Sequence, residues 1–98
     1  MFHFSWMKFK WDSQKNALNQ LKHHISFETA VHIFDDPYYI EIYDSEHSME
    51  EDRYIALSFV NDVIFVVFTE RKDYIRLISA RLATESERRL YYDQNILY

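Results

Sequence analysis

The chain has 98 residues, enough for one domain with a modest hydrophobic core. It has no cysteine, which excludes disulfides and thiolate chemistry, and no apolar run reaches the ~20 residues of a membrane helix. The formal charge of −5 is uneven, because residues 1–22 carry +3, residues 23–52 carry −9 and residues 53–98 carry +1. Two segments could therefore form a basic surface for a polyanion, and we expect a cytoplasmic protein.

The first part of the chain predicts one strand and two helices. Apolar and basic residues alternate over 7–11, the pattern of a half-buried strand. Asp12 is a suitable N-cap for a helix over 13–24. This helix would bury an apolar stripe of Ala17, Leu18, Leu21 and Ile25. Ser26 would cap a second helix that ends before Pro37. Its buried residues would be Phe27, Ala30, Val31 and Phe34.

The second part predicts four strands and a last helix. The strands are expected over 38–43, 53–60, 63–70 and 74–81. Asn61 and Asp62 tolerate the positive φ of a tight hairpin turn, and a second turn is expected over 71–73. The sequence T-E-S-E at 84–87 is a capping box that opens the C-terminal helix. The order β-α-α-β-β-β-β-α predicts an α+β domain, a compact antiparallel sheet with helices packed on one face.

The strand over 74–81 contains two arginines within an apolar run. In a regular strand Arg76 and Arg81 point to opposite faces, because side chains alternate. Ile75, Leu77 and Ser79 would then share the face of Arg81, whereas Ile78 and Ala80 would share that of Arg76. An unpaired buried guanidinium costs on the order of several kcal/mol, so each arginine needs an acid, the sheet rim or an anionic ligand.

Arginines also cluster around the hairpin that contains this strand. Arg71, Arg76 and Arg81 belong to the hairpin, and Arg53 begins the first strand of the meander. Guanidinium groups suit phosphate because they offer parallel donors and keep their charge at physiological pH. The alternative is ion pairing with nearby acids, namely Glu70, Asp73, Glu85 or Glu87.

A second cluster, Lys22, His23 and His24, ends the first helix. A histidine exchanges protons near neutral pH, and a neighbouring lysine stabilises developing negative charge, as RNA cleavage requires. The alternative is that these cations simply complement the helix dipole.

Metal binding has little support in the sequence. The candidate groups are His23, His24 and His32, or Asp44, Glu46 and His47, and neither has the i, i+4 spacing of a helical zinc motif. We therefore expect no metal and no cofactor. The acidic stretch 44–52 is expected to be a solvated loop, unless its His47 or Glu51 organises Arg53.

Seven short motifs then follow one another along the chain. They are FKWDSQK at 9–15, KHHISFE at 22–28, FDDP at 34–37, HSMEEDRY at 47–54, TER at 69–71, IRLISAR at 75–81 and ERRLY at 87–91. Together, from about Met7 to Tyr92, they resemble the BrnT family of type II toxin-antitoxin toxins. The resemblance implies a ribonuclease with a compact RelE-like fold and an RNA substrate. It also implies neutralisation by a BrnA-type antitoxin, a ribbon-helix-helix DNA-binding protein that would form a heterotetramer with the toxin and alone contact DNA.

The resemblance also implies site residues. The family's usual motif residues fall on Lys22, His23, Arg53, Arg71 and Arg81. We expect His23, Lys22, Arg71 and Arg81 to be catalytic, and Arg53 to bind RNA together with the hairpin cations Arg76 and Lys72. The chain departs from the family pattern at His24, where glycine is common, at Asp52, and at Leu57 and Ser58. A glycine would end the helix in a left-handed turn, so His24 is expected to change the helix end or weaken the toxin. We expect one toxin domain over 1–98, with residues 1–6 as an N-terminal extension.

The expected reaction is metal-independent cleavage of RNA that inhibits translation and growth. In it, His23 transfers protons with help from Lys22, while Arg71 and Arg81 hold the phosphate. One alternative is a non-catalytic, degenerate toxin that binds its antitoxin as a co-repressor. A metal-dependent nuclease is a further alternative.

Overall fold

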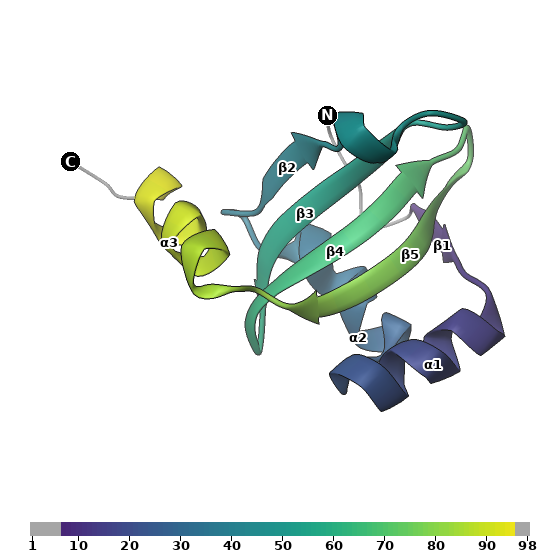
Figure 1. Ribbon diagram of the computed structural model, residues 1–98, viewed down its shortest axis with the longest axis horizontal. Coiled ribbons are helices and arrows are strands. Elements are labelled where there is room, and N and C mark those ends of the chain that lie inside the picture. Colours follow the sequence, from purple (N-terminus) through teal and green to yellow (C-terminus); the bar gives the residue numbers. More distant parts are fainter. Residues whose placement is uncertain (1–6, 96–98) are drawn as a thin grey trace.

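A computed structural model describes residues 7–95 of the chain. Its sheet has five strands in the order β1-β5-β4-β3-β2 (Figure 1). The bounds are β1 Lys8–Lys10, β2 Ile40–Tyr43, β3 Arg53–Val60, β4 Asp62–Glu70 and β5 Tyr74–Leu82. The α+β class and the element order are confirmed. The sheet is mixed rather than wholly antiparallel, because β1 runs parallel to β5 while the other pairs are antiparallel.

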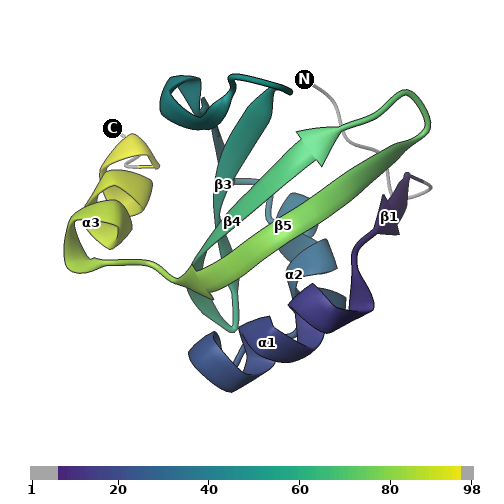
Figure 2. The same cartoon turned by 45° about the vertical axis from the view of Figure 1, so that its right-hand side comes forward.

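Helices cover both faces of this sheet. Their bounds are α1 Ser13–His23, α2 Phe27–Ala30, η1 Val31–Asp35, η2 Ser45–His47 and α3 Glu85–Gln94. Figures 1 and 2 show α1 and α2 on one side of the sheet and α3 on the other. We expected all helices on one face of the sheet, and this holds for α1 and α2 but not for α3. The buried Tyr91 of α3 packs with Leu57 and Val63, which belong to the opposite face from the α2 contacts. Among the described residues no helix is long and apolar enough to cross a membrane.

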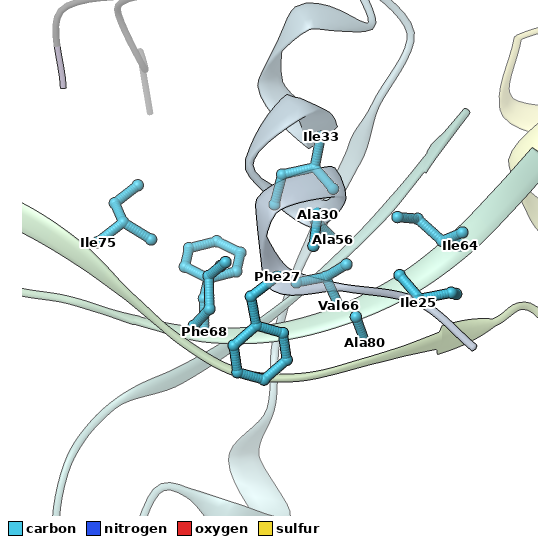
Figure 3. Close-up of a cluster of buried hydrophobic side chains, with 11 residues drawn as sticks. Ile25, Phe27, Ala30, Ile33, Ala56, Ile64, Val66, Phe68, Ile75 and Ala80 are labelled. Carbon is cyan, nitrogen blue, oxygen red and sulfur yellow. The ribbon is translucent and has the colours of Figure 1, made fainter. Parts of the chain in front are cut away.

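The main core lies between α2, η1 and the sheet. Phe27 and Ile33 are fully buried and face strand residues that include Val66 and Phe68 (Figure 3). Ser26 caps α2 as expected, its Oγ accepting the N–H of Thr29 at 3.1 Å. Burying side chains of this size contributes about 1.5–3 kcal/mol each, so this layer supplies most of the hydrophobic stabilisation.

The helix α1 has its expected position but a different buried face. Leu18 and Leu21 are 64% and 77% exposed, whereas Asn16 and Asn19 are buried. The Asn19 amide donates to the carbonyls of Ala80 and Ile25 at 2.8 Å and accepts the N–H of Ala80 at 3.1 Å. Beside β5, β1 pairs only with Tyr74 to Arg76, so the later part of this edge needs other partners. Of the apolar stripe predicted for α1, Ile25 is buried as expected, whereas Ala17, Leu18 and Leu21 are exposed. The prediction was wrong for these three residues because hydrogen bonding to an open strand decides which face of the helix is buried.

A β-bulge in β5 changes the expected alternation of its side chains. Val67 pairs with Ser79 and Phe68 pairs with Leu77, so Ile78 is an extra residue in the ladder. Ile75, Leu77 and Ala80 are consequently buried on the α2 side. Arg76 and Arg81 then share the opposite side, which we call the arginine face. The predicted separation of these two arginines was wrong because a regular period of two does not count an inserted residue.

Two left-handed residues complete the turns of this glycine-free chain. Asn61 has φ 65° in the β3–β4 hairpin, as expected. His24 ends α1 with φ 59° and ψ 26°, and its N–H donates to the carbonyl of Gln20 at 2.9 Å. His24 therefore adopts the left-handed conformation that glycine favours. The expected extension, residues 1–6, lies outside the described residues.

Candidate active site

The arginine face contains a cavity of about 440 Å³. We call it the arginine cavity. Its polar lining consists of Asp44, Glu46, His47, Arg53, Ser79 and Arg81. Its apolar lining consists of Ile55, Phe65, Val67 and Ile78. Two of the predicted site residues, Arg53 and Arg81, thus open onto one space, although the same space also carries acidic groups.

Arg81 is held by contacts on two sides. Its Nη1 and Nη2 donate to the two carboxylate oxygens of Glu87 at 2.8 and 3.0 Å, and Nη1 also donates to the carbonyl of Leu82 at 3.1 Å. The guanidinium carbon lies 3.8 Å from the centroid of the Phe65 ring, a cation–π contact. The hydrogen bond from Arg81 holds the pKa of Glu87 below its ordinary value. The alternative of ion pairing thus applies to Arg81, yet its side chain stays 33% exposed at the cavity.

Arg53 and Arg76 lie in a row that crosses the arginine face. The register pairs Thr69 of β4 with Arg53 on one side and with Arg76 on the other, and Arg76 pairs in turn with Lys10 of β1. Residues paired in this way share a face. Within the described part of the chain, neither Arg53 nor Arg76 forms an ion pair. The buried Thr69 hydroxyl between them likewise has no hydrogen-bond partner there.

Arg71 and Lys72 are placed in the turn between β4 and β5, away from Arg81. Arg71 forms an ion pair with Glu51, which ties this turn to the loop before β3. Arg71 lies in the turn just before Tyr74, the first residue of β5. Tyr74 and Arg81 are seven residues apart on this strand, which is about 23 Å at ~3.3 Å per residue. The structure therefore does not bring Arg71 and Arg81 together around one phosphate.

Lys22 and His23 lie beside a second, smaller hollow of about 220 Å³. It is also lined by Lys15, Leu18 and Asn19 of α1 and by Ile78 and Ser79 of β5. We call it the histidine hollow. Ile78 and Ser79, the two residues that oppose Val67 at the bulge, line both the arginine cavity and the histidine hollow. The structure thus places His23 next to the cavity of Arg81, on the other side of the bulge.

Three features of this region were not predicted from the sequence. His47 is paired with Asp44, the Nδ1 to Oδ2 distance being 2.9 Å, and both residues line the arginine cavity. The i, i+3 spacing of an acid and a histidine could have indicated this pair in a short helical turn. No sequence pattern indicated Phe65 or Thr69 as part of the site, because their positions beside arginines depend on the sheet register.

Two other arrangements compete less well as a polyanion site. A hollow of about 610 Å³ lies between η1 and the β3–β4 turn, and its charged lining is Glu28, His32, Asp35 and Asp36. Such an acidic lining repels phosphate. Among the described residues, no three metal-binding side chains are grouped closely enough to hold a metal ion.

The fold is that of a small α+β domain in which cationic side chains line two spaces beside β5. A family model described as "Ribonuclease toxin, BrnT, of type II toxin-antitoxin system" matches residues 11–87. The fold is also similar to the crystal structure of the Brucella abortus ribonuclease toxin BrnT. The TM-score is 0.62 and the identity 25%, over 81% of this chain and 99% of that chain. A search of curated proteins found no match. The chain belongs to the BrnT family of ribonuclease toxins of type II toxin-antitoxin systems.

Proposed function

We propose that this toxin cleaves single-stranded RNA without a metal ion, and that cleavage inhibits translation and growth in the cytoplasm. The observation that carries the proposal is the junction at Ile78 and Ser79. These two residues border both the cavity lined by Arg81 and the hollow lined by His23. A phosphate at this junction would lie between a fixed cation and a group able to exchange a proton at neutral pH.

In the proposed reaction the 2′-hydroxyl of one nucleotide attacks the adjacent phosphorus. A bond forms between the 2′-oxygen and phosphorus, the bond to the 5′-oxygen breaks, and a proton moves from the first oxygen to the second. His23 transfers the proton and Lys22 offsets the negative charge on the phosphate oxygens. Arg81 binds those oxygens through the parallel N–H donors of its guanidinium group.

The remaining cations bind flanking phosphates. Arg53 and Arg76 support this role because they face one side of the sheet and lack ion-pair partners among the described residues. Lys72 and Arg71 extend the cationic surface to the β4–β5 turn. Arg71 was expected to share one phosphate with Arg81, and its distance from Arg81 favours a flanking phosphate instead.

The antitoxin completes the proposal. A type II system neutralises its toxin with a protein, and we assign this role to a BrnA-type antitoxin with a ribbon-helix-helix domain. The two proteins would form a heterotetramer, in which only the antitoxin contacts DNA. Co-expression of such an antitoxin should restore growth and co-purify with the toxin, whereas recovery of the toxin alone would contradict this assignment.

The direct test is cleavage of a single-stranded RNA by purified Arg81→Ala in excess chelator. Loss of a donor to the developing charge should lower the rate about a hundredfold or more. Arg89→Ala is a matched control, because Arg89 pairs with Glu85 on the exposed side of α3 and does not line the cavity. A residual rate within threefold of the wild type would remove Arg81 from the mechanism, and inactivation by chelator would contradict metal independence.

A non-catalytic co-repressor is the second candidate. It is favoured by the pairing of Arg81 with Glu87 and of Arg71 with Glu51, because both guanidinium groups already have carboxylate partners. Expression of the toxin alone distinguishes the two functions. Growth arrest that Arg81→Ala abolishes in a folded protein supports the nuclease, whereas a folded, non-toxic wild type supports the co-repressor.

A further inference from the structure

The contacts of Arg81 use only part of its hydrogen-bonding capacity. A guanidinium group has five N–H donors, and three of them reach Glu87 and Leu82. Among the described residues, the Nε–H and the second hydrogen of Nη2 have no acceptor. These two hydrogens lie on the same edge of the planar group, with the spacing that matches two oxygens of a phosphate. Arg81 can therefore hold Glu87 and a phosphate at the same time, on different edges.

Glu87 is itself held in place by the start of α3. Its Oε1 accepts the N–H of Thr84 at 2.8 Å, while the Thr84 hydroxyl accepts the N–H of Glu87 at 3.3 Å. This reciprocal capping box fixes the carboxylate relative to the helix. The hydrogen bond from Arg81 is the main cause of the lowered pKa of this carboxyl. The Glu87 side chain is only 22% exposed, so solvent weakens the pairing less than at the open surface.

Phe65 restrains the same guanidinium from another direction. Its ring lies 3.8 Å from the guanidinium carbon and belongs to β4, directly opposite Arg81 in the ladder. The group is thus bounded by a carboxylate at one edge and by an aromatic ring on one face. A long, flexible side chain held in this way loses little entropy when it binds an anion.

We propose that Glu87 is a positioning residue for Arg81, holding the guanidinium so that its Nε/Nη2 edge faces a phosphate group of RNA in the arginine cavity. This inference rests on the proposed function, because it assigns a partner to the arginine expected to bind the reacting phosphate. Glu87 does not touch the substrate. The ion pair is therefore part of the site and does not compete with it.

The first test follows the Nε–H signal of Arg81 by nitrogen-15 NMR of the full chain, assigned by comparison with Arg81→Lys. Glu87→Gln keeps an oxygen for the Thr84 cap but loses the second acceptor and the charge. The chemical shift of the Arg81 Nε–H should change in this variant, because the guanidinium is no longer held over the Phe65 ring. Glu85→Gln, which alters the exposed pair with Arg89 on the same helix, should leave the signal unchanged. An unchanged signal in Glu87→Gln would overturn the inference.

The second test measures a response to an RNA probe that cannot be cleaved. A 2′-O-methyl oligoribonucleotide should shift the Arg81 Nε–H signal in the wild type and in Glu85→Gln, and much less in Glu87→Gln. An equal shift in all three proteins would show that Arg81 finds phosphate without Glu87. This readout does not need catalysis, so it separates the positioning role from the proposed nuclease activity.

The third test is kinetic. Glu87→Gln should lower kcat about tenfold or more with KM for RNA changed less than twofold, because misplacement acts mainly on the reacting group. In the Arg81→Ala background the same substitution should have no further effect, since residues acting as a unit are not additive. Additive losses would overturn the inference. If the wild type failed to cleave RNA while the NMR responses held, the nuclease proposal would fall and the positioning role would stand.

Discussion

The two faces of the sheet are built from the same strands but carry different side chains, mainly buried apolar residues on one face and several arginines on the other. On the α2 side, alternate residues such as Val66 and Phe68 are fully buried, and α2 and η1 cover them. On the arginine face, α3 covers one end with Tyr91, while Arg53 and Arg76 remain without carboxylate partners among the described residues. The comparison teaches that the first face provides most of the hydrophobic stability, whereas the second leaves cationic side chains partly exposed.

The largest expected effect tests the stability of the α2 side. Phe68→Ala should lower the free energy of unfolding by about 3–5 kcal/mol, because the side chain is fully buried and the cavity cannot fill. Phe59→Ala, at a residue of β3 that is 49% exposed, should cost less than about 1 kcal/mol. Denaturant titration measures both, and similar losses would contradict the contrast between the faces.

The next effect concerns the polar contact between α1 and β5. Asn19→Ala leaves the N–H and carbonyl of Ala80 without partners and should cost about 3 kcal/mol. Leu21→Ala on the same helix should change stability by no more than ~0.5 kcal/mol, because Leu21 is exposed. The opposite ranking in denaturant titration would restore the apolar stripe that the sequence predicted.

The third prediction tests availability on the arginine face. Arg53→Gln and Arg76→Gln should each leave stability within ~0.5 kcal/mol, because neither breaks an ion pair described here. Each should weaken binding of a 2′-O-methyl oligoribonucleotide and reduce the slope of log Kd against log salt by about 0.7. Arg89→Gln is the control and should leave the slope unchanged. A loss of stability with an unchanged slope would mean that these arginines serve the fold.

The fourth prediction concerns pH. The folded-state pKa of Glu87 is lowered, so its pairing stabilises the protein above the ordinary glutamate pKa of about 4.3 and is lost as pH falls through the lower, folded value. The free energy of unfolding should therefore decline on acidification below about pH 5, and Glu87→Gln should lose part of this decline. Identical pH profiles for the two proteins would show that the pair contributes nothing to stability.

The smallest expected effect is at the end of α1. His24 holds a left-handed conformation, which costs a residue with a Cβ atom roughly 1 kcal/mol. His24→Gly should therefore raise the melting temperature slightly, with a gain of about 0.5 kcal/mol or less after the greater freedom of glycine in the unfolded chain is subtracted. A destabilised variant would indicate that the imidazole makes a stabilising contact of its own.

Local signals in the sequence predicted most of the elements. The strand over 53–60 has the bounds of β3, and the capping box at Thr84 and the Asn61 turn were recognised, because each depends on neighbouring residues. The burial of Asn19 was not predictable in this way. Its partner Ala80 lies 61 residues away, and the need for that partner arises only when β1 pairs with part of β5.

The candidate site shows the same division. Residue type alone indicated arginines and a histidine suited to phosphate chemistry. Their arrangement depends on the bulge at Ile78, which places Arg76 and Arg81 on one face, and on the register that puts Phe65 beside Arg81. The distance between Arg71 and Arg81 likewise follows from the length of the hairpin. The alternation of apolar and polar residues along a strand does not indicate a bulge, a strand register or a hairpin length.

The Asn19 contact also bears on how copies of the protein meet one another. An outer strand with unpaired backbone groups is a template for adding a strand from another chain, which leads to aggregation or unwanted dimers. At Ala80 the Asn19 amide occupies both backbone groups, and nearer the start of β5 the strand β1 occupies the edge. The Asn19 side chain thus helps to block the edge of the sheet against strand addition. Two copies of the toxin are therefore less able to pair with each other there, which keeps the protein available for its antitoxin.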